Sequence, residues 1–135
     1  NISLAEGFGL GTLEAMMGAT PIIAPCTGGL TRQVVDHRDG THNGVAMPIE
    51  FKTLVGSQGV PYIYEDYVAV ETISNAIMTL HNKSPDEMKE LRVKVKDYAK
   101  TQFSMNNTID DWDRTMLECI EKFKTGYKAW ECEEL

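Results

Sequence analysis

Short apolar segments alternate with helical ones along the first third of the chain. Three segments have the length and apolar content of buried parallel strands: 1–4, 21–24 and 44–47. Between the first two, Leu10, Leu13 and Met17 share one face of a helix that Gly18 ends. Between the last two, residues 30–35 have the spacing of a shorter helix. This order of strands and helices predicts an α/β fold with a Rossmann-like parallel sheet.

The second half of the chain is predicted to be helical from Val68 onward. The first helix there has four apolar positions on one face: Val70, Ile73, Ile77 and Leu80. A second helix begins after Ser84, which forms a capping box with Glu87, and continues to near Gln102. Ser104 can cap a last helix. Its apolar positions form a long stripe: Ile109, Trp112, Met116, Ile120, Phe123, Tyr127 and Trp130.

Composition indicates one ordinary globular domain. The 135 residues are 42% hydrophobic and 24% charged, and no stretch is long and apolar enough to cross a bilayer. Cys26, Cys119 and Cys132 show neither metal-ligand spacing nor a disulfide framework, which favours a reducing, cytoplasmic setting. The net charge of −7 argues against nucleic acid as a partner, because neutralising phosphates needs a basic face.

The segment 6–16, with the sequence EGFGLGTLEAM, carries the densest candidate chemistry. Its glycine-rich turn opens directly into the helix that begins at Leu10, and the backbone N–H groups at such a helix start suit a phosphate. Glu6 lies before the turn, and Glu14 lies about one turn into the helix. Carboxylates are poor phosphate ligands but good acceptors for sugar hydroxyls. The segment therefore predicts recognition of a sugar joined to a phosphate.

This segment also carries a resemblance to a known family. Together with Gly18, the strand 21–24 and the turn 28–30, it closely resembles the C-terminal domain of retaining GT-B glycosyltransferases of group 1. That family includes sucrose synthases and bacterial mannosyl- and glucosyltransferases, and its hallmark is a pair of glutamates with seven residues between them. The string around the two glutamates is far more specific than the pair alone.

The resemblance is clear up to Met47 and is limited to the helix pattern after it. It implies that the chain is a Rossmann-like, parallel-sheet half-domain of the GT-B fold with a helical C-terminal region. Within 1–135, the expected parts are a donor-site core at 1–47, an insertion at 48–67 and a helical tail at 68–135.

The resemblance implies a retaining transfer of a hexose from a nucleoside-diphosphate sugar to a hydroxyl acceptor. Glu6 would be the catalytic residue, touching donor-sugar hydroxyls near the reacting carbon, and Glu14 would bind the ribose hydroxyls. Six further residues would hold the donor: Gly7, Phe8, Gly9, Leu10, Gly28 and Gly29. The donor would be a UDP-, GDP- or ADP-sugar, with no metal or other cofactor expected. The partners would be an acceptor on carbohydrate, lipid or protein and an N-terminal GT-B domain.

Residues 48–67 depart from the pattern of that family. The stretch 51–58 has the character of an insertion, and 60–64 that of an extra edge strand, because Pro61 disfavours a central position. Partner or donor selectivity is the only role that this pattern suggests.

Two other functions remain open at this point. The chain could be a non-catalytic nucleotide-binding or interaction module, with the last helix and residues 48–67 as partner surfaces. It could also belong to a GT-B-fold sugar-nucleotide epimerase. An exposed strand edge at 1–4 would in addition favour homo-oligomers. The residues do not specify the donor base, the sugar or the acceptor.

Overall fold

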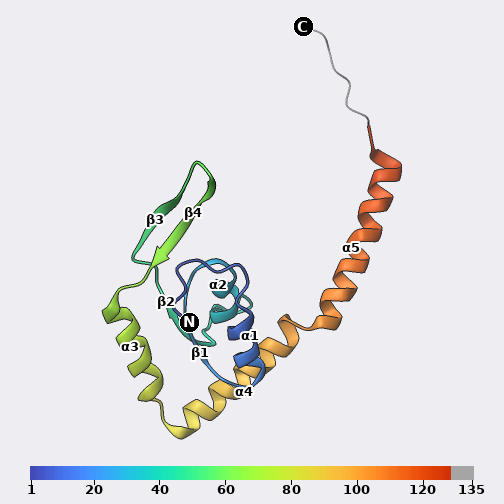
Figure 1. Ribbon diagram of the computed structural model, residues 1–135. Helices are drawn as coiled ribbons and strands as arrows, with labels where there is room; N and C mark the ends of the chain where they lie inside the picture. Colours follow the sequence, from blue (N-terminus) through green and yellow to red (C-terminus); the bar gives the residue numbers. More distant parts are fainter. Residues whose placement is uncertain (129–135) are drawn as a thin grey trace. The chain divides into compact units, whose positions relative to one another are not determined.

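The computed structural model describes residues 1–128, which form a mixed α/β structure (Figure 1). The chain divides into two compact units, residues 1–102 and the residues from 103 on. Unit 1 contains eight elements: α1 (Leu10–Met17), β1 (Ile22–Pro25), α2 (Gly28–Val34), β2 (Gly44–Met47), β3 (Phe51–Ser57), β4 (Val60–Tyr67), α3 (Val70–His81) and α4 (Pro85–Gln102). Unit 2 contains α5 (Met105–Gly126). No helix among the described residues is both long and apolar enough to cross a membrane.

A two-stranded parallel sheet lies at the centre of unit 1. β1 pairs with β2 from Ile22 opposite Gly44 to Pro25 opposite Met47. The helix α2 connects the two strands and packs against both of them, which is the expected strand–helix–strand unit. The core around this sheet consists of residues with no exposed surface: Met16, Ala24, Leu30, Val34, Met47, Val95, Tyr98 and Ala99. The predictions of strands near 21–24 and 44–47 are therefore confirmed.

The predicted strand at Asn1–Leu4 is wrong. The segment has no strand structure, and the Ile2 side chain is 63% exposed. Only the amino group of Asn1 reaches β1, where it donates to the carbonyl of Ile23 at 2.9 Å. The carbonyl of Leu4 instead accepts from the N–H of Asp66 at 2.7 Å. Because the backbone groups of this segment point to two different partners, they cannot form a ladder with β1.

The helix α1 has the predicted bounds but buries a different face. Leu10 is 68% exposed, whereas Thr12 and Met16 are buried. Gly18 ends the helix as predicted, but the left-handed residue is its neighbour Ala19, with φ of 62°. The N–H of Ala19 donates to the carbonyl of Met16 at 2.9 Å. An alanine therefore occupies a conformation that normally selects glycine.

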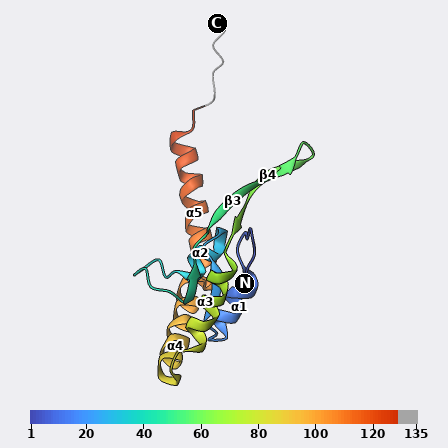
Figure 2. The same ribbon diagram turned by 90° about the vertical axis from the view of Figure 1, so that its left-hand side faces the viewer.

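Residues 51–67 form a β-hairpin that extends away from the helices of unit 1 (Figure 2). β3 and β4 pair antiparallel from Phe51 opposite Tyr67 to Ser57 opposite Val60, with a bulge after Val55. The predicted edge strand at 60–64 is thus one half of a hairpin, and it continues to Tyr67. The hairpin carries exposed apolar side chains on both of its faces: Phe51, Leu54, Val60, Tyr62, Ile63 and Tyr64.

The helix α3 packs beside the parallel sheet, and α4 packs against α1. α3 packs against β2, but its exposed side chains include Val70 and Ile77, and its buried residue is Ala76. The predicted apolar face of α3 is therefore only partly the buried one. The capping box before α4 is confirmed, because the N–H of Ser84 donates to the Glu87 carboxylate at 2.8 Å and the N–H of Glu87 donates to the Ser84 hydroxyl at 3.3 Å.

The buried Tyr98 connects α4 to the last turn of α2. Its hydroxyl donates to the carbonyl of Arg32 at 2.6 Å. Nearby, Asp36 has no exposed surface and pairs with Arg38, whose guanidinium lies 2.8 Å from the carboxylate and 5.1 Å from the Tyr98 ring centroid. The guanidinium, through its hydrogen bonds, lowers the pKa of Asp36 below its ordinary value.

The helix α5 is capped as predicted, since the N–H of Asn107 donates to the Ser104 hydroxyl at 3.4 Å. None of its residues is buried, and the predicted apolar stripe is exposed from Ile109 through Trp112 to Tyr127. Trp130 and Cys132, which also belonged to the sequence predictions, lie outside the described residues.

Candidate functional site

Two glycine-containing loops meet at the end of the parallel sheet where β1 finishes. The turn Gly28–Gly29 follows β1 and begins α2, and it lies against the loop that carries Glu6. The N–H of Gly29 donates to the carbonyl of Glu6 at 3.3 Å. A Cβ atom on Gly28 would lie 1.8 Å from that same carbonyl oxygen, and one on Gly29 would lie 2.6 Å from the Cα of Phe8. The close backbone approach explains why both residues of the turn are glycine.

Gly9 is required by the fold for a different reason. It precedes α1 in the left-handed conformation, with φ of 87°, and a Cβ there would lie 2.6 Å from the Leu30 side chain. Polar contacts hold this turn in place. The Thr12 hydroxyl lies 2.7 Å from the Gly9 carbonyl and 2.5 Å from Gln33 Oε1, and Gln33 Nε2 donates to the Phe8 carbonyl at 2.5 Å. The helix α2 therefore orients the start of α1.

Gly7 and Gly11 have no such structural reason to be glycine. A Cβ atom on either would meet no other atom within 4 Å, and neither has a left-handed backbone. Both residues are exposed and flank the turn that opens α1. The start of α1 also lacks a side-chain cap. The backbone on this side of the loop is consequently accessible to a ligand at the positive end of the helix.

The two glutamates occupy different environments. Glu6 is half-buried, and its carboxylate accepts from the Ser3 hydroxyl at 3.4 Å. Glu14 is exposed on α1, one turn beyond the glycine loop. Phe8 and Leu10 are exposed at 45% and 68%. The structure thus brings Glu6, Gly7 and Phe8 into contact with the Gly28–Gly29 turn, whereas Glu14 extends from a neighbouring helix.

A shallow cavity of about 380 Å³ adjoins the glycine turn at Gly28. It is lined by Gly28, Thr31, Arg32, Val35 and His37. The His37 ring is oriented by its Nδ1 atom, which lies 3.0 Å from the Tyr98 hydroxyl. Cys26 precedes the turn and is half-buried, and its partial burial raises the pKa of its thiol. Among residues 1–128 no three His, Cys, Asp or Glu side chains gather in a way that could hold a metal ion.

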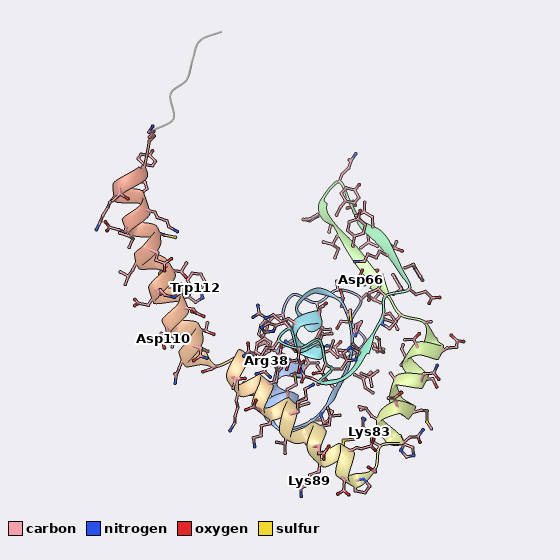
Figure 3. The ribbon with its side chains drawn as sticks, turned by 180° about the vertical axis from the view of Figure 1, so that it is seen from behind. Arg38, Asp66, Lys83, Lys89, Asp110 and Trp112 are labelled. Carbon is pink, nitrogen blue, oxygen red and sulfur yellow. The ribbon has the colours of Figure 1, made fainter. Side chains whose placement is uncertain are left out.

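Two residues at the base of the hairpin were not selected from the sequence: Lys52 and Asp66. Asp66, labelled in Figure 3, is 7% exposed. Its carboxylate lies 3.3 Å from the Lys52 ammonium group. Thr27, which precedes the glycine turn, and Lys52 both lower the pKa of Asp66 below its ordinary value. Lys52 and Asp66 are opposite each other in the hairpin. The sequence could indicate this pair only if the pairing register of β3 and β4 were already known.

No known protein-family model matches the chain, and no curated protein matches it.

Proposed function

We propose that this chain supplies the nucleotide-sugar-binding part of a retaining GT-B glycosyltransferase. The proposal starts from the resemblance of segment 6–16 and its continuation to that family. The observation that carries it furthest is the contact between the Glu6 loop and the Gly28–Gly29 turn, which are 22 positions apart at Glu6 and Gly28. Both loops lie at the carboxyl end of β1, the end of a parallel sheet where ligands bind.

The unexplained glycines of this loop support a ligand on its exposed side. Packing accounts for Gly9, Gly28 and Gly29, but it does not account for Gly7 and Gly11. A ligand that lies directly against the backbone would require small residues at those two positions. The uncapped start of α1, to which both are adjacent, would stabilise the negative charge of a diphosphate.

In the proposed reaction each of the two carboxylates has a different role. Glu6, held by Ser3 and by its own backbone contact with Gly29, would orient the donor sugar and accept hydrogen bonds from its hydroxyls. Glu14, exposed on α1, would bind the ribose hydroxyls of the nucleotide. The departing diphosphate would be stabilised by the N–H groups at the start of α1. The finer fold assignment, a Rossmann-like GT-B half-domain, belongs to this same proposal.

The test is a binding titration with UDP-, GDP- and ADP-glucose and the corresponding mannose conjugates. Calorimetry measures the binding of each nucleotide sugar. We expect one base to be preferred, and Gly7→Val to weaken that binding by about tenfold or more because its side chain would occupy the ligand's position. Gly126→Ala is the matched control, since it also adds a side chain in open space, but on α5. Both variants should melt close to the wild-type temperature.

Two outcomes would contradict the proposal. If the wild-type protein binds none of the six nucleotide sugars at millimolar concentration while remaining folded, the donor-site assignment is wrong. If it binds one of them and Gly7→Val binds equally well, the ligand does not lie on the exposed side of this loop.

A second function is favoured by one observation, the exposure of the apolar stripe of α5 from Ile109 to Tyr127. A helix of 22 residues with no buried side chain is typical of a segment that packs on a partner. On this view the chain is an interaction module. A folded protein that binds no nucleotide sugar in the titration above would favour it.

A further inference from the structure

A histidine with a fixed ring orientation lines the shallow cavity beside the glycine turn. The other lining residues of this cavity are Gly28, Thr31, Arg32 and Val35. One nitrogen of the His37 ring, Nδ1, lies 3.0 Å from the hydroxyl of the buried Tyr98. The two rings also meet edge to face, with their centroids 6.0 Å apart. The ring of His37 is thus held by a buried partner although the residue itself is exposed.

The hydrogen bonds of Tyr98 determine which nitrogen of His37 carries the proton. The Tyr98 hydroxyl lies 2.6 Å from the carbonyl of Arg32 and 3.4 Å from that of Val35. Because a carbonyl can only accept, the single hydrogen of this hydroxyl is donated to the nearer carbonyl, that of Arg32. The Tyr98 oxygen therefore accepts from His37, and Nδ1 is the protonated nitrogen. In the neutral imidazole the other nitrogen, Nε2, then carries a lone pair and acts as an acceptor.

Arg32 supplies hydrogen-bond donors to the same cavity. Its side chain is exposed and forms an ion pair with no carboxylate among residues 1–128, whereas the guanidinium of Arg38 lies 2.8 Å from the carboxylate of Asp36. The guanidinium of Arg32 offers several N–H donors, and the hydroxyl of Thr31 can donate or accept. Val35, at the end of α2, is half-buried and adds an apolar surface. The cavity therefore combines donors, an acceptor and an apolar wall.

This combination of groups fits a sugar better than an anion. A sugar hydroxyl both donates and accepts, so one hydroxyl can donate to Nε2 of His37 while its neighbour accepts from the guanidinium of Arg32. The C–H groups of a sugar ring can pack on the apolar side chain of Val35. An ionised phosphate or carboxylate has acceptors only, and it would face the lone pair of a neutral His37 without a hydrogen bond.

We propose that the cavity beside Gly28 is a carbohydrate subsite, in which His37 accepts from one hydroxyl of the ligand and Arg32 donates to a neighbouring one. Gly28 belongs to this cavity and to the candidate donor site, since it also packs on the carbonyl of Glu6. A sugar in the cavity would therefore be the hydroxyl acceptor of the transfer, and the acceptor would be a carbohydrate rather than a lipid or a protein. This last role rests on the proposed function, whereas the subsite itself can be tested without a nucleotide sugar.

The first measurement needs no ligand. Heteronuclear NMR of the histidine ring nitrogens at about pH 8, above the ordinary titration range of histidine, identifies the protonated nitrogen. We expect His37 to carry its proton on Nδ1. In Tyr98→Phe the hydroxyl that accepts this proton is gone, so the tautomer with the proton on Nε2 should appear. The ring signals of His81, at the end of α3, are the internal reference and should be the same in both proteins.

The second measurement follows the same ring signals while the protein is titrated with glucose, mannose, galactose or inorganic phosphate. We expect at least one sugar to shift the His37 signals saturably at millimolar concentration, and phosphate to leave them unchanged. Arg32→Met removes the guanidinium but keeps the backbone carbonyl that Tyr98 uses, and it should weaken sugar binding by about fivefold or more. Arg92→Met is the matched control, because Arg92 is an exposed arginine of α4 that does not line this cavity. It should bind the sugar as the wild type does.

Each of three results would overturn the inference. They are a wild-type His37 with its proton on Nε2, His37 signals that no sugar shifts, and His37 signals that shift with phosphate but not with sugar. Because none of these measurements uses a nucleotide sugar, their outcome is separate from that of the donor titration. If a sugar binds at His37 but the protein binds no nucleotide sugar, the carbohydrate subsite is supported and only its role as the acceptor site fails with the proposed function.

Discussion

Gly28→Ala is the substitution for which the structure makes the sharpest prediction. Gly28 has a φ of +45°, in the left-handed region, and it packs directly on the backbone of Glu6. An added Cβ would lie 1.8 Å from the Glu6 carbonyl oxygen, whereas real Cβ contacts essentially never fall below 3.0 Å. Because the obstructing atom belongs to the backbone, no side-chain rotation can relieve the overlap.

The expected loss of stability has two parts. Placing alanine in the left-handed conformation costs about 1–2 kcal/mol. Moving the Glu6 loop away from α2 to relieve the overlap costs about 1–3 kcal/mol more, as for overpacked cores. The free energy of unfolding should therefore fall by about 2–5 kcal/mol. For a unit of this size each kcal/mol lowers the melting temperature by about 4–8 °C, so a decrease of at least about 8 °C is expected.

Differential scanning calorimetry of the wild type, Gly28→Ala and Gly7→Ala measures this effect. Gly7 belongs to the facing loop but has open space around it and no left-handed backbone, so its substitution should change the melting temperature by less than about 2 °C. If Gly28→Ala has the same melting temperature as Gly7→Ala and the wild type, the close contact between the two loops is refuted.

Two further predictions concern the rest of unit 1. Ala19→Gly should raise the free energy of unfolding by about 1 kcal/mol, because it relieves the left-handed backbone at φ of 62°; urea denaturation measures it, and a loss of stability would contradict the strain. Asp36 has a folded-state pKa below its ordinary value because of Arg38, so its contribution to stability is present above that ordinary value and lost as the pH falls through the folded pKa. Asp36→Asn should therefore be less stable than the wild type at neutral pH, and the difference should shrink between about pH 5 and pH 2 in urea titrations. An unchanged difference over that range would show that the ionised carboxylate is not its source.

Local signals in the sequence were sufficient to predict most of the helices. The capping box of Ser84 and Glu87 and the cap at Ser104 are both present in the structure, because each depends on residues only three positions apart. The face that a helix buries depends on its neighbours instead. Leu10 is exposed while the polar Thr12 is buried, because Gln33 of α2 provides a partner for the Thr12 hydroxyl.

The site was predictable only where its parts are continuous in sequence. The segment from Glu6 to Gly9 is continuous, and its glycine-rich pattern predicts a turn before α1. The contact of Glu6 with Gly29 and the pairing of Asp66 with Lys52 depend on the tertiary fold, and no local pattern specifies them. The same reason explains why Asn1–Leu4 was wrongly predicted to be a strand, since its apolar character does not specify the partners of its backbone.

The position of the tryptophans determines which optical signals can follow the candidate site. Both tryptophans of the sequence, Trp112 and Trp130, come after residue 102, and Trp112 is on α5 (Figure 3). Residues 1–102, which include the glycine loops, therefore have no tryptophan of their own. A tryptophan introduced in place of Phe51, on the hairpin beside Asp66, would give unit 1 an emission signal of its own. With Trp112 and Trp130 replaced by phenylalanine, the emission of this single tryptophan would follow events near the candidate site.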